Sequence, residues 1–514
     1  MEEDHFLLKP QGFTVETKRV NDINSDSTHK SELEIQNVAN NDEFSKEGNY
    51  SMQFIAGITA SLSVAVLSAN IVWNSPGIPH LKSNESDFSV TDTQGGWIIS
   101  IYHFADIIGS LLNILLIDRI GRKFSLLLSG IPALMAWILI INAKNIFYIL
   151  IARFIAGIGQ GFTYNTVVIY LAEIAEKDIR GTLVAIMRTI QGLFHFLLTG
   201  VGTFFSYHTL NLTSIFVPIL FLITFSFMPE SPYFFLLQGR DDDAMKSLMK
   251  LRGHTNSLSL KVVVREMKLD IEEKERYKSN SVRELFLRNY NLKCLFIVMC
   301  MKLTQVMAGH SAIFNYTQEI FHHSGSSIPP KISVLILSGI VLLSTLAAGL
   351  IMDRISKRIT FLISGILSAI FLATVGIFFF LKFSTKIDVT PITWLPLTSL
   401  ILYEIVYYLG IAIIPYILQG ELFAMNVKGA AVAFGMIIGS CFSFISNTGY
   451  NYISIHAGVY IAFWFYAIVA IIGSILTFRI TPDSNRKTLE EIHAMENPEM
   501  KRKLELERIN RLKK

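Results

Sequence analysis

Long apolar stretches alternate with short polar segments along most of this chain. A helix that crosses a bilayer needs about 20 predominantly apolar residues, and twelve stretches are long enough. They begin near Ser51, Gln94, Ser125, Asn145, Gly181, Asn211, Asn291, Ile332, Thr360, Thr393, Gly429 and His456. Six lie before and six after a charged segment, so the pattern predicts an all-α membrane protein built from two six-helix halves.

The same pattern divides the chain into consecutive parts. Residues 1–48 are polar and poor in aromatic side chains, so we expect them to be disordered and cytoplasmic. Residues 49–228 and 291–480 are the two expected bundles. Residues 229–290 form a charged cytoplasmic linker for which we expect short helices, and residues 481–514 a cytoplasmic tail.

Charge sets the expected orientation and excludes several classes of function. The 514 residues are 51% apolar and 17% charged, unlike a soluble domain. Cations gather on one side of the predicted helices, which predicts a multi-pass protein of the cell membrane with both termini cytoplasmic. The net charge of +4 is spread over many loops, so no nucleic-acid partner is expected. Without a nucleophile–base, metal-ligand or phosphate-binding pattern, we expect no enzyme, cofactor or metal.

A charged motif occurs twice. Residues 118–123 read DRIGRK, and residues 353–358 read DRISKR. Glu173 precedes Arg180 by the same spacing that separates Glu421 from Lys428. Each cluster lies where an apolar stretch ends. Two similar halves in one polytopic chain are typical of secondary transporters built from parallel repeats.

The motifs together resemble those of the sugar porter family of the major facilitator superfamily, in particular insect facilitated trehalose and hexose transporters. The resemblance covers roughly residues 51–495. Its elements are WNSP at 73–76, Arg153 with Gly157, Gly159 and Gly161, PESP at 229–232, LRG at 251–253, TPD at 481–483 and KTLEEI at 487–492. The resemblance implies the major facilitator fold, with twelve transmembrane helices in two pseudo-symmetric halves.

The resemblance also implies a cytoplasmic gate made of ion pairs that close while the carrier faces outward. The corresponding residues here are Arg122, Lys123, Glu173 and Arg180 in one half, and Lys357, Arg358, Glu421 and Lys428 in the other. Exposed pairs contribute only about 0–1 kcal/mol each, which suits a gate that must open. The alternative is that these charges only set the membrane orientation. Ser356 replaces the glycine that this motif usually carries.

In the family, amide side chains and aromatic rings hold sugar hydroxyls at mid-membrane, and this chain keeps few of them. Gln305 and Tyr316 match, whereas Ser311 replaces an asparagine and Arg188 a glutamine. The candidate substrate-binding residues are Gln305, Ser311, Tyr316, Arg188, Gln191 and Tyr416.

Arg188 is the most unusual of these residues. A cation at the bilayer centre costs at least ~2.5–3.5 kcal/mol, so it should face water or a partner. We hypothesise an ion pair with Asp106 or Glu404. The alternative interpretation is that Arg188 binds an anionic substrate.

These features predict a facilitative sugar carrier that works by alternating access and functions as a monomer, its substrate trehalose, a hexose or a polyol. The first stretch, residues 51–73, contains no carboxylate, whereas proton-coupled family members carry an aspartate there. A proton-coupled symporter and a sensor that no longer transports remain alternatives. Asn84 and Asn211 lie in glycosylation sequons on the expected outer side.

Overall fold

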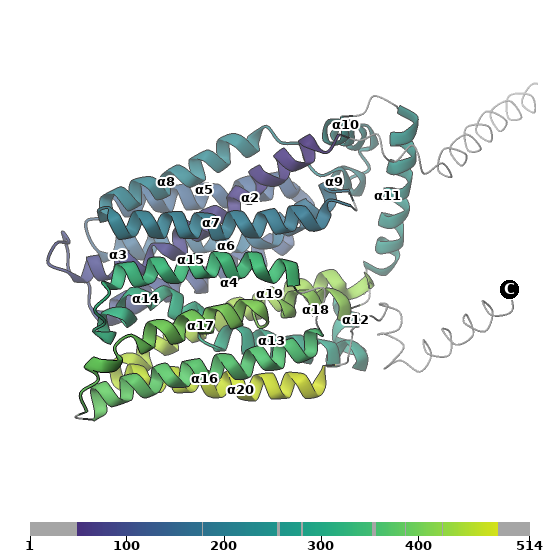
Figure 1. Ribbon diagram of the computed structural model, residues 1–514. Helices are drawn as coiled ribbons and strands as arrows, with labels where there is room; N and C mark the ends of the chain where they lie inside the picture. Colours follow the sequence, from purple (N-terminus) through teal and green to yellow (C-terminus); the bar gives the residue numbers. More distant parts are fainter. Residues whose placement is uncertain are drawn as a thin grey trace, which may run out of the picture.

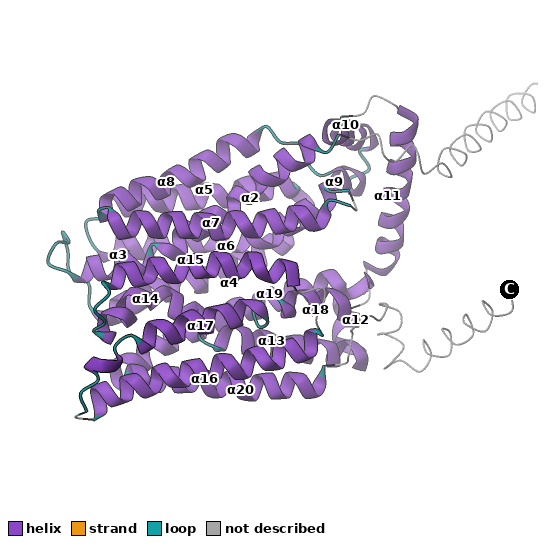
Figure 2. Ribbon diagram, in the orientation of Figure 1, coloured by secondary structure: helices purple, strands orange, loops and turns teal. Residues whose placement is uncertain are grey.

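The computed structural model describes residues 49–481, apart from 177, 254–256, 279–280, 352–355, 386 and 424. The N-terminal segment 1–48 and most of the C-terminal tail lie outside these residues. Every regular element in the described part is a helix (Figure 2). Twelve spans are long and apolar enough to cross a membrane, which confirms the predicted all-α membrane architecture.

The helices form two halves that stack as adjacent blocks (Figure 1). The N-terminal half consists of α2 (Ser51–Val72), α3 (Asn74–Lys82), α4 (Asp92–Ile120), α5 (Arg122–Ile141), α6 (Ile146–Ile174), α7 (Arg180–Phe204) and α8 (Tyr207–Ser226). The C-terminal half consists of α13 (Asn289–Met307), α14 (His310–Ser324), α15 (Pro330–Ile351), α16 (Lys357–Ser384), α17 (Leu395–Leu409), α18 (Ile414–Leu422), α19 (Met425–His456) and α20 (Val459–Ile480), with a 3₁₀ turn at Thr390–Ile392.

Four helices outside the membrane spans connect the halves at one end of the bundle, which we call the linker end. They are α9 (Pro232–Leu237), α10 (Asp241–Arg252), α11 (Ser257–Lys278) and α12 (Ser281–Leu287). Leu236, Leu248 and Leu260 form a small apolar core among α9, α10 and α11. α10 contacts α2 of the N-terminal half and α11 contacts α19 of the C-terminal half, so the linker touches both halves (Figure 1). We call the opposite end of the bundle, where α3 and α14 lie, the far end.

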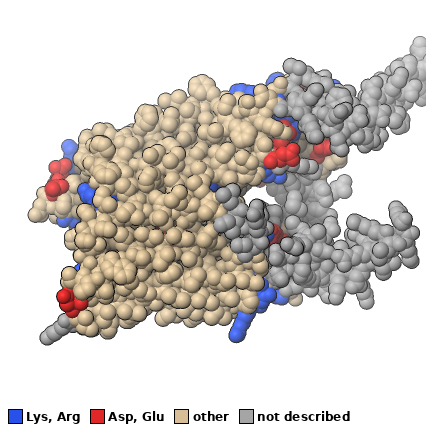
Figure 3. Space-filling view, viewed as in Figure 1, with Lys and Arg blue, Asp and Glu red and all other residues tan. Residues whose placement is uncertain are grey.

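Side-chain polarity follows the membrane geometry. On the face seen in Figure 3, Lys, Arg, Asp and Glu gather at the two ends of the molecule, and the surface of the wide middle band is almost free of them. Large apolar side chains such as Leu115, Phe216 and Ile472 are more than half exposed. Because lipid tails are as apolar as these side chains, this exposure is what a bilayer favours.

Glycine allows α4 and α6 to pack closely. A Cβ atom at Gly157 would lie 2.3 Å from the Tyr102 carbonyl oxygen, and one at Gly161 would lie 2.2 Å from the Ser110 nitrogen. No larger residue fits without separating the helices. This pair is a small-xxx-small contact of the kind that drives helix association in lipid.

Two spans are broken in mid-membrane. The seventh span is interrupted between α13 and α14 at Gly309, where φ is +89°. The tenth is interrupted between α17 and α18 near Gly410. A break frees backbone groups that lipid cannot satisfy, so breaks are tolerated only beside protein or a wet cavity. Both breaks lie beside the cavity described next.

Candidate functional site

A cavity lies between the halves. Its larger part, which we call the central lobe, has a volume of about 310 Å³ and receives side chains from both halves, among them Gln191 and Ser311. A second part of about 200 Å³, the side lobe, is lined by Asp106, Gln160 and Lys302, among others. The lobes share Tyr164, Gln191, Gln305 and Tyr416 as lining residues.

The structure gathers most of the predicted substrate-binding residues around this cavity. Arg188, Gln191, Gln305, Ser311 and Tyr416 all line the central lobe.

Tyr316 is the exception among the predicted residues. It lines neither lobe, is 4% exposed, and packs its ring 4.7 Å from that of Tyr450. On α14 the cavity face is occupied by His310, Ser311, Phe314 and Asn315. A helix rotates by 100° per residue, so position 316 points away from that face. Tyr316 is therefore a packing residue in this structure.

Gln305 caps the broken tenth span. Its Nε2 donates hydrogen bonds to the carbonyl oxygens of Ile411 (3.2 Å) and Ala412 (2.7 Å). Its Oε1 accepts from Lys302 Nζ at 3.1 Å. Both amide N–H donors are thus used inside the protein, and the helix break is satisfied by a side chain from another span.

Lys302 is a cavity residue that the sequence analysis missed. It lies on α13, its side chain is 2% exposed, and its Nζ is 3.4 Å from the centre of the Tyr416 ring. The available signal was a lone charge in the middle of the seventh apolar stretch. Such a charge in a membrane span is a functional-site hypothesis by default.

Arg188 lies between two aromatic rings rather than beside a carboxylate. Its Cζ is 5.1 Å from the centre of the Tyr164 ring and 5.3 Å from that of Tyr416. No ion pair within 4.0 Å joins Arg188 to Asp106 or Glu404, all three of which are described residues. The hypothesised ion pair is therefore absent from this structure.

The two carboxylates have other partners. Asp106 accepts hydrogen bonds from Ser440 Oγ at 2.8 Å and from Gln160 Nε2 at 3.0 Å. Glu404 is fully buried, and its carboxylate lies 3.2 Å from His310 Nδ1. The sequence alone could not predict which of these side chains lie close together, because the two residues of each pair lie on different helices.

Polar contacts hold the halves together at the far end. Asn74 donates to Asn315 (2.8 Å), and Asn315 donates to Asn447 (2.8 Å). Lys82 pairs with Glu319 of the other half at 3.5 Å and with Asp92 of its own half at 2.7 Å.

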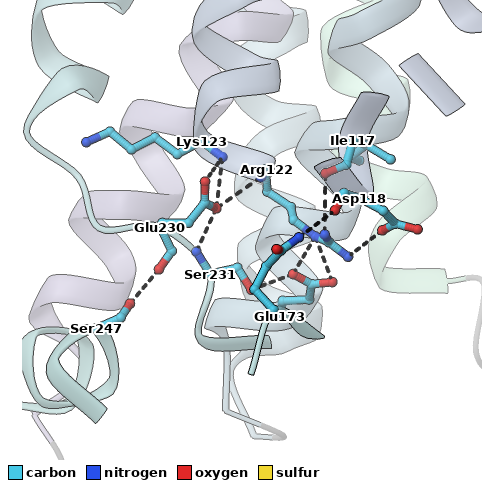
Figure 4. Close-up of polar contacts among 9 residues, drawn as sticks. Ile117, Asp118, Arg122, Lys123, Glu173, Glu230, Ser231 and Ser247 are labelled. Carbon is cyan, nitrogen blue, oxygen red and sulfur yellow. Dashed lines mark hydrogen bonds and ion pairs between the residues drawn. The ribbon is translucent and has the colours of Figure 1, made fainter. Parts of the chain in front are cut away.

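The N-terminal copy of the charged motif lies at the linker end, in a dense polar cluster (Figure 4). Arg122 Nε lies 2.9 Å from the carboxylate of Glu173, and Arg122 also pairs with Asp118 at 3.2 Å. Ser231 Oγ donates to Glu173 at 2.5 Å. The linker thus contributes to the cluster, a role that the sequence analysis did not assign.

Glu230 anchors the start of α5. Its carboxylate accepts backbone N–H bonds from Arg122 and Lys123, each at 3.0 Å, and from Ser231 at 2.8 Å. A carboxylate at a helix N-terminus interacts favourably with the helix dipole. Burial nevertheless raises the pKa of Glu230 above its usual value, and the hydrogen bonds from Lys123 and Ser231 only partly offset that effect.

The C-terminal copy of the motif is sparser. Lys357 forms an ion pair with Glu421. Arg358 donates to the Phe478 carbonyl oxygen at 2.6 Å, and its Cζ lies 4.2 Å from the Phe478 ring centre. Arg180 is exposed, and the side chain of Lys428 lies outside the described part of the chain. Among the residues described at this end, each ion pair of the two motif copies stays within its own half.

The two glycosylation sequons differ. Asn84 is exposed in the segment between α3 and α4 at the far end. Asn211 is 1% exposed within α8, and its Oδ1 accepts a hydrogen bond from Trp73 Nε1 at 2.8 Å. A glycan cannot attach to an amide that is buried and hydrogen-bonded in this way. The expectation of a glycan on Asn211 is therefore wrong.

Comparison with known proteins agrees with this architecture. The chain is 30% identical to a facilitated trehalose transporter of Apis mellifera ligustica, over 86% of this chain and 88% of that one. It is also 30% identical to one of Culex quinquefasciatus, over 86% of this chain and 85% of the relative. The partially occluded inward-open structure of the xylose transporter XylE from E. coli shares the fold, with a TM-score of 0.72 and 18% identity, covering 85% of this chain and 100% of that one. The model of the family described as "Sugar (and other) transporter" matches residues 46–495, and the chain belongs to this family.

Proposed function

We propose that the protein is a facilitative carrier that moves a sugar across the cell membrane by alternating access. The observation that carries this proposal is a cavity with polar side chains from both halves, which are joined across the far end by Asn74–Asn315 and Lys82–Glu319. The cations favour the linker end as the cytoplasmic end, with both termini on that side. The structure then corresponds to an inward-facing state.

Transport in this scheme exchanges one set of contacts for another. The far-end contacts break as the halves rock, and the charged motif copies at the linker end approach each other. Arg180, which is exposed at the linker end, is then available to meet the opposite half. Partly exposed pairs such as Lys82–Glu319 contribute only about 0–1 kcal/mol each, so neither state is locked.

The substrate class follows from the family and from the relatives, which are named for facilitated trehalose transport. Gln191, Ser311, Arg188 and Tyr416 are the cavity side chains that we propose contact the sugar, with Gln305 positioning the helix break beside it. We further propose that the carrier acts as a monomer, without catalysis, and that Asn84 is its glycosylation site.

A proton-coupled symporter is the second candidate, favoured by one specific observation. Glu404 and His310 lie 3.2 Å apart, and His310 lines the central lobe. Carboxylates and histidines in contact inside a membrane protein are typical of proton relays. Helix α2 carries no acidic residue, which favours uniport.

Uptake into proteoliposomes tests the proposal and separates the two candidates. We expect saturable entry of labelled trehalose, glucose or a polyol that stops when the inside and outside concentrations are equal. Protein-free liposomes are the control. Concentrative uptake driven by an acidic outside would favour the symporter, and absence of saturable flux for every sugar would contradict transport.

A further inference from the structure

Two cations share one aromatic ring in the cavity. Lys302 Nζ lies 3.4 Å from the centre of the Tyr416 ring, and Arg188 Cζ lies 5.3 Å from it. They reach this ring from different halves, Arg188 on α7 and Lys302 on α13. Because like charges repel, two cations converge in this way only where a ring or an anion offsets the repulsion.

Neither cation has a carboxylate partner. Among the described residues, no Asp or Glu oxygen lies within 4.0 Å of Arg188 or Lys302. The protein acceptor for Lys302 is Gln305 Oε1 at 3.1 Å, which uses one of the three ammonium donors. Charges inside a membrane protein are usually paired or turned toward a water-filled cavity. Arg188, which lines the central lobe and hydrogen-bonds Tyr164 and Tyr416, and Lys302, which lines the side lobe, each keep unused N–H donors.

The nearby carboxylates do not cancel both charges. Glu404 is fully buried beside His310 at 3.2 Å and lines neither lobe. Asp106 lines the side lobe with its carboxylate held by Ser440 and Gln160. Arg188 and Lys302 against this one carboxylate leave an excess of one basic side chain along the cavity walls. One negative charge on the cargo would compensate it.

A neutral sugar loses one of its expected amide donors in this cavity. The amide of Gln305, which matches a sugar-binding position, already spends both N–H donors on the carbonyls of Ile411 and Ala412. The hydroxyl partners in the central lobe are then Gln191, Ser311 and further lining groups such as Asn315, Thr345 and Ser443. That lobe, of about 310 Å³, is at the small end of ligand pockets, which favours a single sugar ring.

We infer that the cargo is a sugar acid, a polyhydroxylated monocarboxylate whose carboxylate binds between Arg188 and Lys302 beside Tyr416. Guanidinium and ammonium groups both bind carboxylates through charge-assisted hydrogen bonds. The hydroxyl groups of the same molecule face Gln191 and Ser311. This inference rests on the proposed transport function and narrows its substrate class.

Membrane voltage gives the test, because a carrier that moves a monoanion moves charge. Proteoliposomes with a potassium gradient and valinomycin are given D-glucuronate or D-glucose as probes. With an interior positive by about 60 mV, glucuronate should accumulate about ten-fold. Glucose should equilibrate at the same level with and without the potential. Glucuronate should also inhibit any glucose entry.

Variants connect the charge effect to the two cations. Arg188→Gln and Lys302→Met should each lower kcat/KM for glucuronate relative to that for glucose at least about ten-fold, because each loses a charge-assisted contact. Arg188→Lys retains the charge and should retain the preference. Arg479→Gln, which removes an exposed cation at the end of α20, is the matched control and should leave the ratio unchanged.

The experiments distinguish a wrong sugar-acid assignment from a wrong carrier function. Saturable glucose or trehalose flux with no transport of, or inhibition by, glucuronate would overturn the sugar-acid assignment and leave the carrier function standing. An unaltered preference in both charge-removing variants would also overturn it. No saturable flux of any probe, from a protein that elutes as a single species, would overturn the carrier function itself.

Discussion

The two halves carry the same charged motif at equivalent positions but build it differently. In the N-terminal copy, the side chains of Arg122 and Glu173 are 7% and 16% exposed. In the C-terminal copy, those of Lys357 and Glu421 are 21% and 27% exposed. The N-terminal pair is further held by Asp118 and Ser231. Burial and neighbours, rather than the motif, therefore set how strongly each pair is held.

The backbone differs at the same point. Gly121 adopts φ +94° and ψ 167°, a region that is essentially restricted to glycine. The equivalent Ser356 has φ −64°, which any residue adopts. The serine in the second motif copy is therefore accommodated without strain. This difference indicates that the N-terminal motif copy is rigid. The ion pair of the C-terminal copy is held more loosely and can break and form again more easily.

The largest expected effect comes from breaking the buried pair. Glu173→Ala leaves the guanidinium of Arg122 buried with only Asp118 as its acidic partner, and should lower the free energy of unfolding by about 3–5 kcal/mol. The measurement is denaturant titration of the purified protein in micelles. Glu421→Ala is the matched control in the other half and should cost about 1 kcal/mol or less. Equal losses would remove the distinction between the halves.

The second prediction concerns the backbone. Gly121→Ala places a Cβ 2.4 Å from the Glu230 carboxylate in a conformation that alanine avoids, and should cost about 2–3 kcal/mol. Ser356→Gly is the reciprocal change. It should cost only about 0.5–1 kcal/mol through the added freedom of the unfolded chain. The same titration compares them, and a large loss for Ser356→Gly would show that the second copy is equally constrained.

The membrane spans could be predicted because the length of an apolar stretch can be read directly from the sequence. The breaks at Gly309 and Gly410 were not, because the second one depends on Gln305 reaching the carbonyls of Ile411 and Ala412 from another helix. A continuous apolar stretch conceals such a cross-helix cap. The sequence thus predicts where the chain crosses the membrane but not where a crossing is interrupted.

The candidate site was predictable only in part, for a related reason. Family positions led to Gln305, which lines the cavity, and to Tyr316, which does not. The expected partner of Arg188 was wrong, because Tyr164 and Tyr416 come from helices whose spacing no sequence pattern reports. Lys302 lacked a matching motif and was missed. Pairing across helices is the information that the sequence alone did not supply.

The third prediction tests how the linker stabilises the N-terminal copy. Glu230→Ala removes the acceptor for the backbone N–H groups of Arg122, Lys123 and Ser231, and should cost about 2 kcal/mol. Glu230→Gln keeps a carbonyl oxygen that can still accept these bonds, and should cost clearly less. The unfolding titration checks both. If alanine and glutamine cost the same, the hydrogen bonds to this side chain contribute little.

The smallest effect is the pH dependence of the same anchor. Burial raises the pKa of Glu230 above its ordinary value of 4.5, so the folded protein takes up this proton more readily than the unfolded chain. The stabilisation that the protonated Glu230 contributes is then fully present below about pH 4.5. It is lost as the pH rises through the folded-state pKa. Glu230→Gln cannot ionise, so the unfolding free energy of wild type minus that of this variant should fall with rising pH. Titrations from pH 4 to pH 8 measure this difference, in which the other acidic groups cancel. A difference that rises with pH would contradict this prediction. It would mean that the helix dipole and the hydrogen bonds stabilise the ionised Glu230 carboxylate by more than burial destabilises it.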